Sequence, residues 1–255
     1  MTTENPFVFG KAAEGNYFTD RIEDSKRLKA NLTHGINTIL ISPRRWGKTS
    51  LVKKVISDID REVAIPVFLD VFQCKSDYDF YQSFANAVIK QTSNKFDEWI
   101  EIAKTFLSNI TPKFSFGSDP MNDFSLSFEW NPDNNSETDI LQLPEKIAQK
   151  KNVRLIICLD EFQQIADFND SLTFQKKLRT IWQHQQNVTY CLFGSKKHLM
   201  ENIFNDKGMP FYKFGDMMFL KKIPTEEWTR FICDKFHETG KTITPAQASK
   251  ICEAT

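Results

Sequence analysis

The clearest structural signal in this 255-residue chain is the stretch Asn37-Thr-Ile-Leu-Ile-Ser-Pro-Arg-Arg-Trp-Gly-Lys-Thr-Ser-Leu51. Its first five residues, Asn37–Ile41, are mostly apolar and β-branched, a pattern typical of a buried strand. A proline and two arginines interrupt the pattern over Ser42–Trp46, and a helical pattern begins at Gly47. The helical pattern is an apolar stripe formed by Leu51, Val52, Val55, Ile56 and Ile59. The stretch therefore predicts a strand, a loop and a helix.

Strand patterns alternate with helical patterns along most of the chain. Val63–Phe72 is a second apolar strand, and its Pro66 predicts a position at the edge of a sheet. Further strands are predicted over Arg154–Leu159, Val188–Phe193 and Phe214–Leu220. Helices are predicted over Asp77–Ile110, with a break near Ser93 and Asn94, over Ser136–Lys150 and over Leu172–His184. This alternation predicts an α/β fold with a mostly parallel five-stranded sheet flanked by helices.

Two segments depart from this rhythm. Aromatic and polar residues alternate over Pro112–Asn135 around a turn-rich stretch, which predicts an inserted β-hairpin. Its aromatic face either binds a partner or packs onto the flank of its own domain. Helical patterns over Thr225–Thr239 and Pro245–Glu253 predict a small C-terminal helical lid, and the second pattern runs to the end of the chain without a stop signal. We therefore expect a core over residues 1–222 and the start of a truncated lid over residues 223–255.

The loop Ser42–Thr49 matches the phosphate-binding pattern G-x-x-x-x-G-K-[ST] except at its first position, where serine replaces glycine. In such a P-loop, backbone N–H groups and a helix N-terminus cradle phosphates, the lysine reaches the terminal phosphates, and the hydroxyl binds Mg²⁺. The tripeptide Gly-Lys-Thr also arises by chance, but here a strand precedes it and a helix follows. The predicted nucleotide-binding residues of the loop are Ser42, Pro43, Arg44, Arg45, Trp46, Gly47, Lys48, Thr49 and Ser50.

Two adjacent carboxylates, Asp160 and Glu161, follow the apolar run that ends at Leu159. Ligands of parallel sheets bind at the carboxyl ends of the strands, so this pair is expected near the P-loop. Asp160 is predicted to hold Mg²⁺ together with Thr49, and Glu161 to orient or deprotonate the attacking water. The alternative is that the pair only caps the next helix.

Three further residues are candidates with two interpretations each. Ser195 ends another apolar strand, where it either senses the terminal phosphate or holds the attacking water, or else caps the following helix. In either case its strand is expected beside the strand that ends in Asp160. Phe18 and Arg21 either pack on an adenine ring, or serve as a core side chain and as a surface salt bridge with Glu23.

Composition narrows the class of protein. The chain has 33 Lys and Arg residues against 33 Asp and Glu residues, so no global charge favours nucleic acid or an acidic membrane surface. The five cysteines are dispersed without metal-ligand spacing, which argues against a disulfide framework or a zinc site. No signal-peptide pattern and no run of about 18 apolar residues occurs. A cytoplasmic location without a membrane segment is expected.

With these residues together, the chain resembles the archaeal-type ATPase family, a branch of the STAND P-loop NTPases related to AAA+ proteins. The resemblance covers the chain except for the predicted hairpin. The stretches that carry it are Phe18–Glu23, Pro43–Leu51, Phe68–Phe72, Leu159–Gln163 and Phe193–Ser195. It implies a five-stranded ATPase core, a helical lid and, in complete members, a winged-helix domain after the lid.

The resemblance further implies an ATP-driven switch that uses ATP, ADP and Mg²⁺ to control a protein partner or self-association. Relatives often place an arginine after a glycine just before the last strand, whereas here Gly215 is followed by Asp216. Slow hydrolysis by the isolated domain is therefore expected. The alternatives are an ATP-gated interaction module that does not hydrolyse ATP, and a DNA-associated AAA+-like ATPase, which the zero net charge disfavours.

Overall fold

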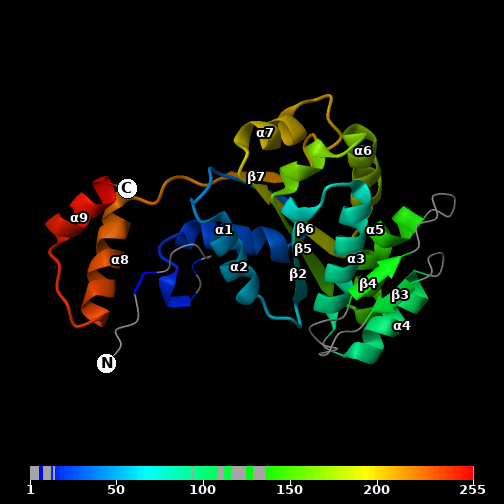
Figure 1. Cartoon of the computed structure of the whole chain (residues 1–255), viewed down its shortest axis with the longest axis horizontal. Coiled ribbons are helices and arrows are strands. Elements are labelled where there is room, and N and C mark those ends of the chain that lie inside the picture. The colour runs from blue at the N-terminus through cyan, green and yellow to red at the C-terminus, as the bar shows by residue number, and fades with distance from the viewer. Residues whose placement is uncertain are drawn as a thin grey trace.

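The computed structural model describes residues 6–7, 13, 15–93, 95–107, 112–115, 125–128 and 136–254. At its centre is a five-stranded, all-parallel sheet with the strand order β2-β5-β6-β1-β7 (Figure 1). The strands are β1 (Thr38–Ile41), β2 (Ala64–Asp70), β5 (Arg154–Asp160), β6 (Val188–Gly194) and β7 (Asp216–Phe219). The predicted five-stranded α/β fold is confirmed, and β2 lies at an edge as Pro66 predicts.

Helices cover both faces of the sheet (Figure 1). One face packs against α1 (Ile22–Thr33) and α2 (Lys48–Ser57), and the other against α3 (Asp77–Thr92), α5 (Ser136–Lys151) and α6 (Ser171–Trp182). The remaining helices are α4 (Phe96–Phe106), α7 (Lys197–Asn205), α8 (Thr225–Glu238) and α9 (Pro245–Glu253). Short 3₁₀ helices are η1 (Gly15–Tyr17), η2 (Val71–Gln73) and η4 (Phe162–Asp167).

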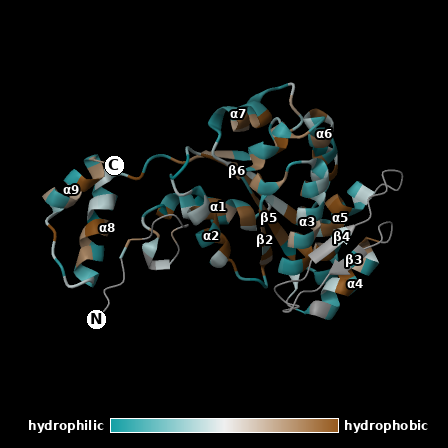
Figure 2. Cartoon of the chain, viewed as in Figure 1, coloured by the Kyte–Doolittle hydropathy of each residue, from teal (hydrophilic) through white to brown (hydrophobic). Residues whose placement is uncertain are grey.

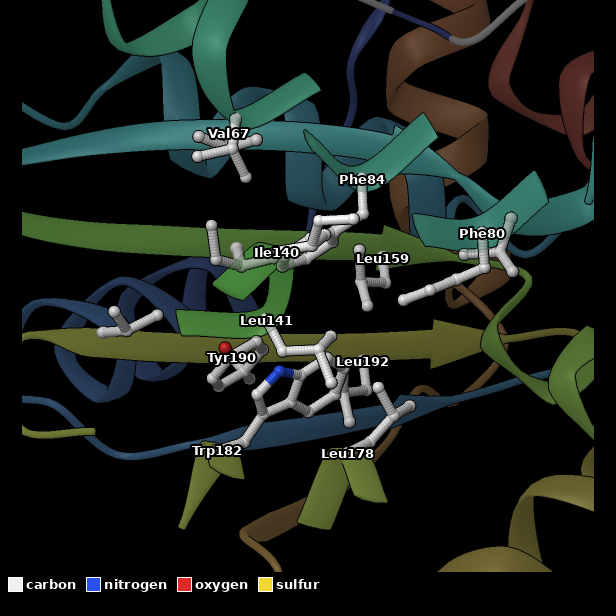
Figure 3. Close-up of a cluster of buried hydrophobic side chains, with 14 of the residues drawn as sticks. Val67, Phe80, Phe84, Ile140, Leu141, Leu159, Leu178, Trp182, Tyr190 and Leu192 are labelled. Carbon is white, nitrogen blue, oxygen red and sulfur yellow. The ribbon is translucent and has the colours of Figure 1, made fainter. Parts of the chain in front are cut away.

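The strands are apolar throughout because both of their faces are buried. Along β5, Leu155, Ile157 and Leu159 face the cluster under α3, α5 and α6, while Ile156 and Cys158 face the cluster under α1 and α2. Figure 3 shows the first cluster, and Figure 2 shows hydrophobic colour concentrated in the central strands. Double burial explains why β5 and β6 read as continuous apolar runs instead of alternating patterns.

The predicted break in the long helical stretch is confirmed. α3 ends at Thr92 and α4 begins at Phe96, while Asn94 lies outside the described residues. Ser93 joins the two helices: its carbonyl accepts a hydrogen bond from Trp99 Nε1 at 2.7 Å. The backbone needs this local side-chain partner because the helical ladder stops there.

The insertion contains the predicted antiparallel pair, β3 (Pro112–Ser115) and β4 (Ser125–Phe128). β4 lies beside α3, on the flank of the core (Figure 1). The aromatic side chains of the segment 112–135 and the stretches 116–124 and 129–135 lie outside the part of the chain that the structure describes.

The two C-terminal helices pack against each other and lie at one end of the molecule, apart from the sheet (Figure 1). The N-terminal segment contacts α8. The Phe7 ring lies 6.4 Å from that of Phe231 and 5.9 Å from that of Phe236, and Lys235 Nζ lies 5.3 Å from the centre of the Tyr17 ring. Both helices predicted for the C-terminal part of the chain are present, as α8 and α9. Among the described helices, none has the length and apolar character needed to cross a membrane.

Candidate nucleotide-binding site

The loop between β1 and α2 forms the centre of the candidate site. Ser42 and Lys48 are buried, whereas the side chains of Arg44 and Arg45 are exposed. Gly47 has a φ of 81°, and a Cβ placed there would meet no atom within 4 Å. The backbone conformation, and not a lack of space, therefore favours glycine at this position. This left-handed residue turns the chain into the first turn of α2, whose N–H groups face the loop.

The Lys48 ammonium is folded back over its own loop. Its Nζ donates to the Ser42 carbonyl at 2.9 Å and to the Pro43 carbonyl at 3.2 Å. Burial lowers the pKa of Lys48, and the carboxylates of Glu161 and Asp160 oppose that effect. A cation held at the loop by two carbonyl acceptors, which phosphate oxygens could replace, fits the role predicted for this lysine.

Thr49 and Asp160, the two predicted Mg²⁺ ligands, are in direct contact. Thr49 Oγ1 donates to Asp160 Oδ2 at 2.8 Å across a sequence separation of 111 residues. Burial raises the pKa of Asp160 to about 6, although hydrogen bonds from Thr49 and from the Glu161 N–H act in the opposite direction. One hydroxyl and one carboxylate beside a phosphate-binding loop match the few protein oxygens that Mg²⁺ takes when phosphates supply the rest. The residues present therefore fit the ion.

Glu161 lies next to Ser195 because β5 and β6 are neighbours, as predicted. Ser195 Oγ donates to Glu161 Oε2 at 2.9 Å, and the Ser195 N–H points to the same oxygen at 3.4 Å. Glu161 has a φ of 50° and its side chain makes no capping bond to η4. The N-cap position of α7 is Lys196. Glu161 thus occupies the N-cap position of η4 without a capping bond from its side chain, and the Ser195 hydroxyl is directed to Glu161 instead of to α7.

Arg21 reaches the P-loop from the N-terminal side. Its side chain is buried, and Nη2 donates to the Trp46 carbonyl at 2.9 Å while Nη1 contacts Asp24 at 3.1 Å. The alternative of a surface salt bridge with Glu23 does not hold, because Arg21 is buried and pairs with Asp24, while Glu23 pairs with Lys26. The buried guanidinium therefore joins the P-loop, through Trp46, to the first turn of α1, through Asp24.

Two more predicted residues lie around this loop. Phe18 packs against the hydrophobic cluster under α1 and α2, which agrees with the core interpretation of this side chain. Ser50 Oγ accepts a hydrogen bond from the Ala13 N–H at 2.9 Å, so the N-terminal segment is attached to α2 immediately behind the P-loop.

Asp216 does not belong to this site. It pairs in register with Thr38 at the amino end of β1, whereas the P-loop follows the carboxyl end of that strand. Its carboxylate accepts hydrogen bonds from Arg27 at 2.7 Å and from Asn31 at 2.8 Å. Asp216 therefore lies at the amino ends of the strands, whereas the P-loop lies at their carboxyl ends.

Sequence reasoning missed Gln163, which is buried beside Glu161. A glutamine two residues after the acidic pair does not by itself indicate burial. The sequence signal that could have found it is Gly194, because a glycine at the end of the strand beside β5 leaves room for a neighbouring side chain.

Comparisons with known proteins show the fold. No protein-family model and no curated protein matches the chain. The Walker-type ATPase PABY2304 of Pyrococcus abyssi is similar in structure, with a TM-score of 0.66 at 15% identity over 98% of this chain and 67% of that one. The Orc2 protein of Aeropyrum pernix, in ADPNP–ADP complexes, has a TM-score of 0.56 at 15% identity over 90% of this chain and 55% of that one.

The Cdc6p protein of Pyrobaculum aerophilum has a TM-score of 0.56 at 11% identity over 92% of this chain and 54% of that one. The chain thus spans about half to two thirds of the length of these proteins. At such low identities the likeness shows a shared fold, that of P-loop ATPases of the Walker and Orc/Cdc6 type.

Proposed function

We propose that the chain binds ATP with Mg²⁺ and hydrolyses it, acting as a nucleotide-dependent switch. The observation that carries the proposal is the 2.8 Å contact between Thr49 Oγ1 and Asp160 Oδ2 at the mouth of a loop that also buries Lys48. Three residue types that phosphate and Mg²⁺ chemistry requires come together there from two distant parts of the sequence. The shared fold of the ATPase structures supports the proposal.

Each residue has a defined role in the proposed reaction. The N–H groups at the start of α2 and the Lys48 ammonium bind the phosphates, and Thr49 with Asp160 holds the metal. Mg²⁺, when bound, neutralises charge on the phosphates. Glu161 accepts the proton of the attacking water, and the Ser195 hydroxyl donates to its carboxylate at 2.9 Å, which fixes its orientation.

The switch part of the proposal rests on the N-terminal segment. Ala13 is bonded to Ser50 of α2, and residues on either side of it, Phe7 and Tyr17, contact α8. A change at the P-loop is therefore linked by a short stretch of chain to α8 and α9, which we propose to be a lid. This link also favours a second candidate, an ATP-gated interaction module that binds a protein partner or a second copy without turnover.

Finer assignments remain part of the proposal. Membership of the STAND branch and a cytoplasmic location rest on the resemblance and on composition. One similar structure, the Orc1 protein of Aeropyrum pernix, was solved in complex with DNA, at 12% identity to this chain. The balanced charge of this chain, 33 basic against 33 acidic residues, gives DNA binding less support than protein binding.

Calorimetric titration of MgATP into wild type and Lys48→Ala tests the site. We expect binding by wild type and a loss of at least about tenfold in affinity for the variant, because a charge-assisted bond to phosphate is removed. Lys54→Ala is the matched control: Lys54 lies on the same helix but pairs with Asp58 on the surface. Equal binding by wild type and Lys48→Ala would contradict the assignment. Phosphate release in the same samples separates the ATPase from the non-hydrolysing module.

A further inference from the structure

Gln163 is a buried amide that the proposed reaction has not yet used. It lies in η4, directly after the acidic pair at the end of β5, and its side chain is 1% exposed. Its Nε2 donates to Glu161 Oε2, while its Oε1 has no hydrogen-bond partner. Reversing the amide would turn Oε1 toward a carboxylate oxygen, so two acceptors would face each other. The carboxylate therefore sets the orientation of this amide.

Gly194 makes room for that amide. A Cβ at Gly194 would lie 1.8 Å from Gln163 Oε1 and 3.0 Å from Gln163 Cδ. Gly194 does not have a positive φ, so the glycine is required by space and not by backbone conformation. It is the last residue of β6 and precedes Ser195. The strand that supplies the Ser195 hydroxyl thus also leaves the space that Gln163 fills.

The two oxygens of Glu161 have different surroundings. Oε2 receives the Gln163 amide, the Ser195 hydroxyl at 2.9 Å and the Ser195 N–H at 3.4 Å. Oε1 has no hydrogen-bond partner among the described residues. One oxygen is therefore anchored from two sides, and the other is left to accept a proton.

We propose that Gln163 is a positioning residue that, with Ser195, anchors Glu161 Oε2 so that Oε1 serves as the proton-accepting atom. The inference rests on the proposed function, in which Glu161 activates water. The buried Oε1 of Gln163 has no hydrogen-bond partner, and an unsatisfied buried acceptor is costly. A leucine would fill a similar volume without this cost. The benefit of glutamine at this position therefore lies in its bond to Glu161.

The first test compares Gln163→Leu with wild type in MgATP binding, steady-state hydrolysis and thermal unfolding. We expect kcat to fall about 10- to 100-fold, because misplacing a reacting group has effects of this size, with ATP affinity unchanged. The melting temperature should stay the same or rise, since the orphaned oxygen is removed. Gln164→Leu, one residue along and bonded to Asp167 at 3.3 Å, is the matched control. An unchanged or increased kcat with intact binding overturns the inference.

A double-mutant cycle tests the same contact from the other side. Gly194→Ala should displace the amide and lower kcat in wild type. It should have little further effect in a Gln163→Ala background, where the contact with Gln163 is gone and only the flexible Met200 Sδ, 3.0 Å from the added Cβ, has to shift. Additive effects of Gly194→Ala and Gln163→Ala on kcat would overturn the inference. The cycle does not use Gln163→Leu, so it decides the question even if that variant folds poorly. If Glu161→Gln abolishes hydrolysis but the Gln163 and Gly194 variants leave it intact, only the role of Gln163 is refuted. No hydrolysis by wild type would refute the proposed enzyme and this inference together.

Discussion

At the scale of single residues, the candidate site brings a buried lysine and a buried aspartate together at the P-loop. Asp160 is 7% exposed, and burial raises its pKa from the ordinary aspartate value of 3.8 to about 6. Below about pH 4 the carboxyl is protonated in both the folded and the unfolded chain. As the pH rises toward 6, the unfolded chain loses the proton first, so stability falls through this window. The ionised carboxylate thus destabilises the fold without a bound cation.

Asp160→Asn should therefore stabilise the protein without its ligand at neutral pH. The expected gain in free energy of unfolding is up to about 2–3 kcal/mol above about pH 7, shrinking toward zero near pH 4, because the neutral amide avoids the buried charge. Urea denaturation at both pH values measures it. Asp234→Asn, on the exposed surface of α8, is the control. A destabilised Asp160→Asn variant at neutral pH would show that its carboxylate is not under strain.

At the scale of elements, the hydrophobic pattern of the sequence was sufficient to predict the central strands. The runs that became β5 and β6 were recognisable because both faces of each strand are buried, and Pro66 indicated the edge strand because it cannot donate to a neighbour. The burial of Arg21 and Gln163 was not predictable. Each depends on contacts with residues distant in sequence, Trp46 and Gly194, that only the folded sheet brings together.

A side chain of α3 pairs with the backbone of the edge strand β2, which the sequence of the strand does not reveal. Gln91 of α3 accepts from the Phe68 N–H at 2.9 Å and donates to the Phe68 carbonyl at 2.8 Å, as a neighbouring strand would. Such pairing satisfies backbone groups that an edge otherwise exposes.

Gln91→Leu should lower the free energy of unfolding by about 1–3 kcal/mol, because both Phe68 backbone groups lose their partner while the apolar volume is kept. Chemical denaturation gives the value, and light scattering at high concentration should show more self-association through the opened edge. Gln149→Leu, on the exposed surface of α5, serves for comparison. A stability equal to that of wild type would mean that solvent replaces Gln91 without cost.

At the scale of the whole molecule, the N-terminal segment joins parts that the sheet does not hold together. It is bonded to α2 through Ala13 and contacts α8 through Phe7 and Tyr17. Sequence analysis predicted the two C-terminal helices but not this contact, because a single phenylalanine in a short terminal segment carries no periodic pattern. The position of α8 beside the N-terminal segment is thus a feature that only the tertiary structure shows.

Phe7→Ala should loosen α8 and α9 selectively. Phe7 packs on two rings of α8, at 6.4 and 5.9 Å, and removing it deletes apolar contact at that surface. Hydrogen exchange should increase in α8 and α9 and stay unchanged in β5 and β6. Phe72→Ala provides the control, since that side chain is 55% exposed. Unchanged exchange in α8 would show that the N-terminal segment does not hold the helical pair.

The central claim is that this site hydrolyses ATP through Glu161. The most direct measurement is single-turnover phosphate release by wild type and Glu161→Gln, with ATP binding measured in the same samples and the exposed Glu23→Gln as control. We predict equal binding and a loss of at least about 100-fold in the hydrolysis rate for Glu161→Gln, the size expected when a general base is removed. Equal phosphate release by wild type and Glu161→Gln would contradict the account.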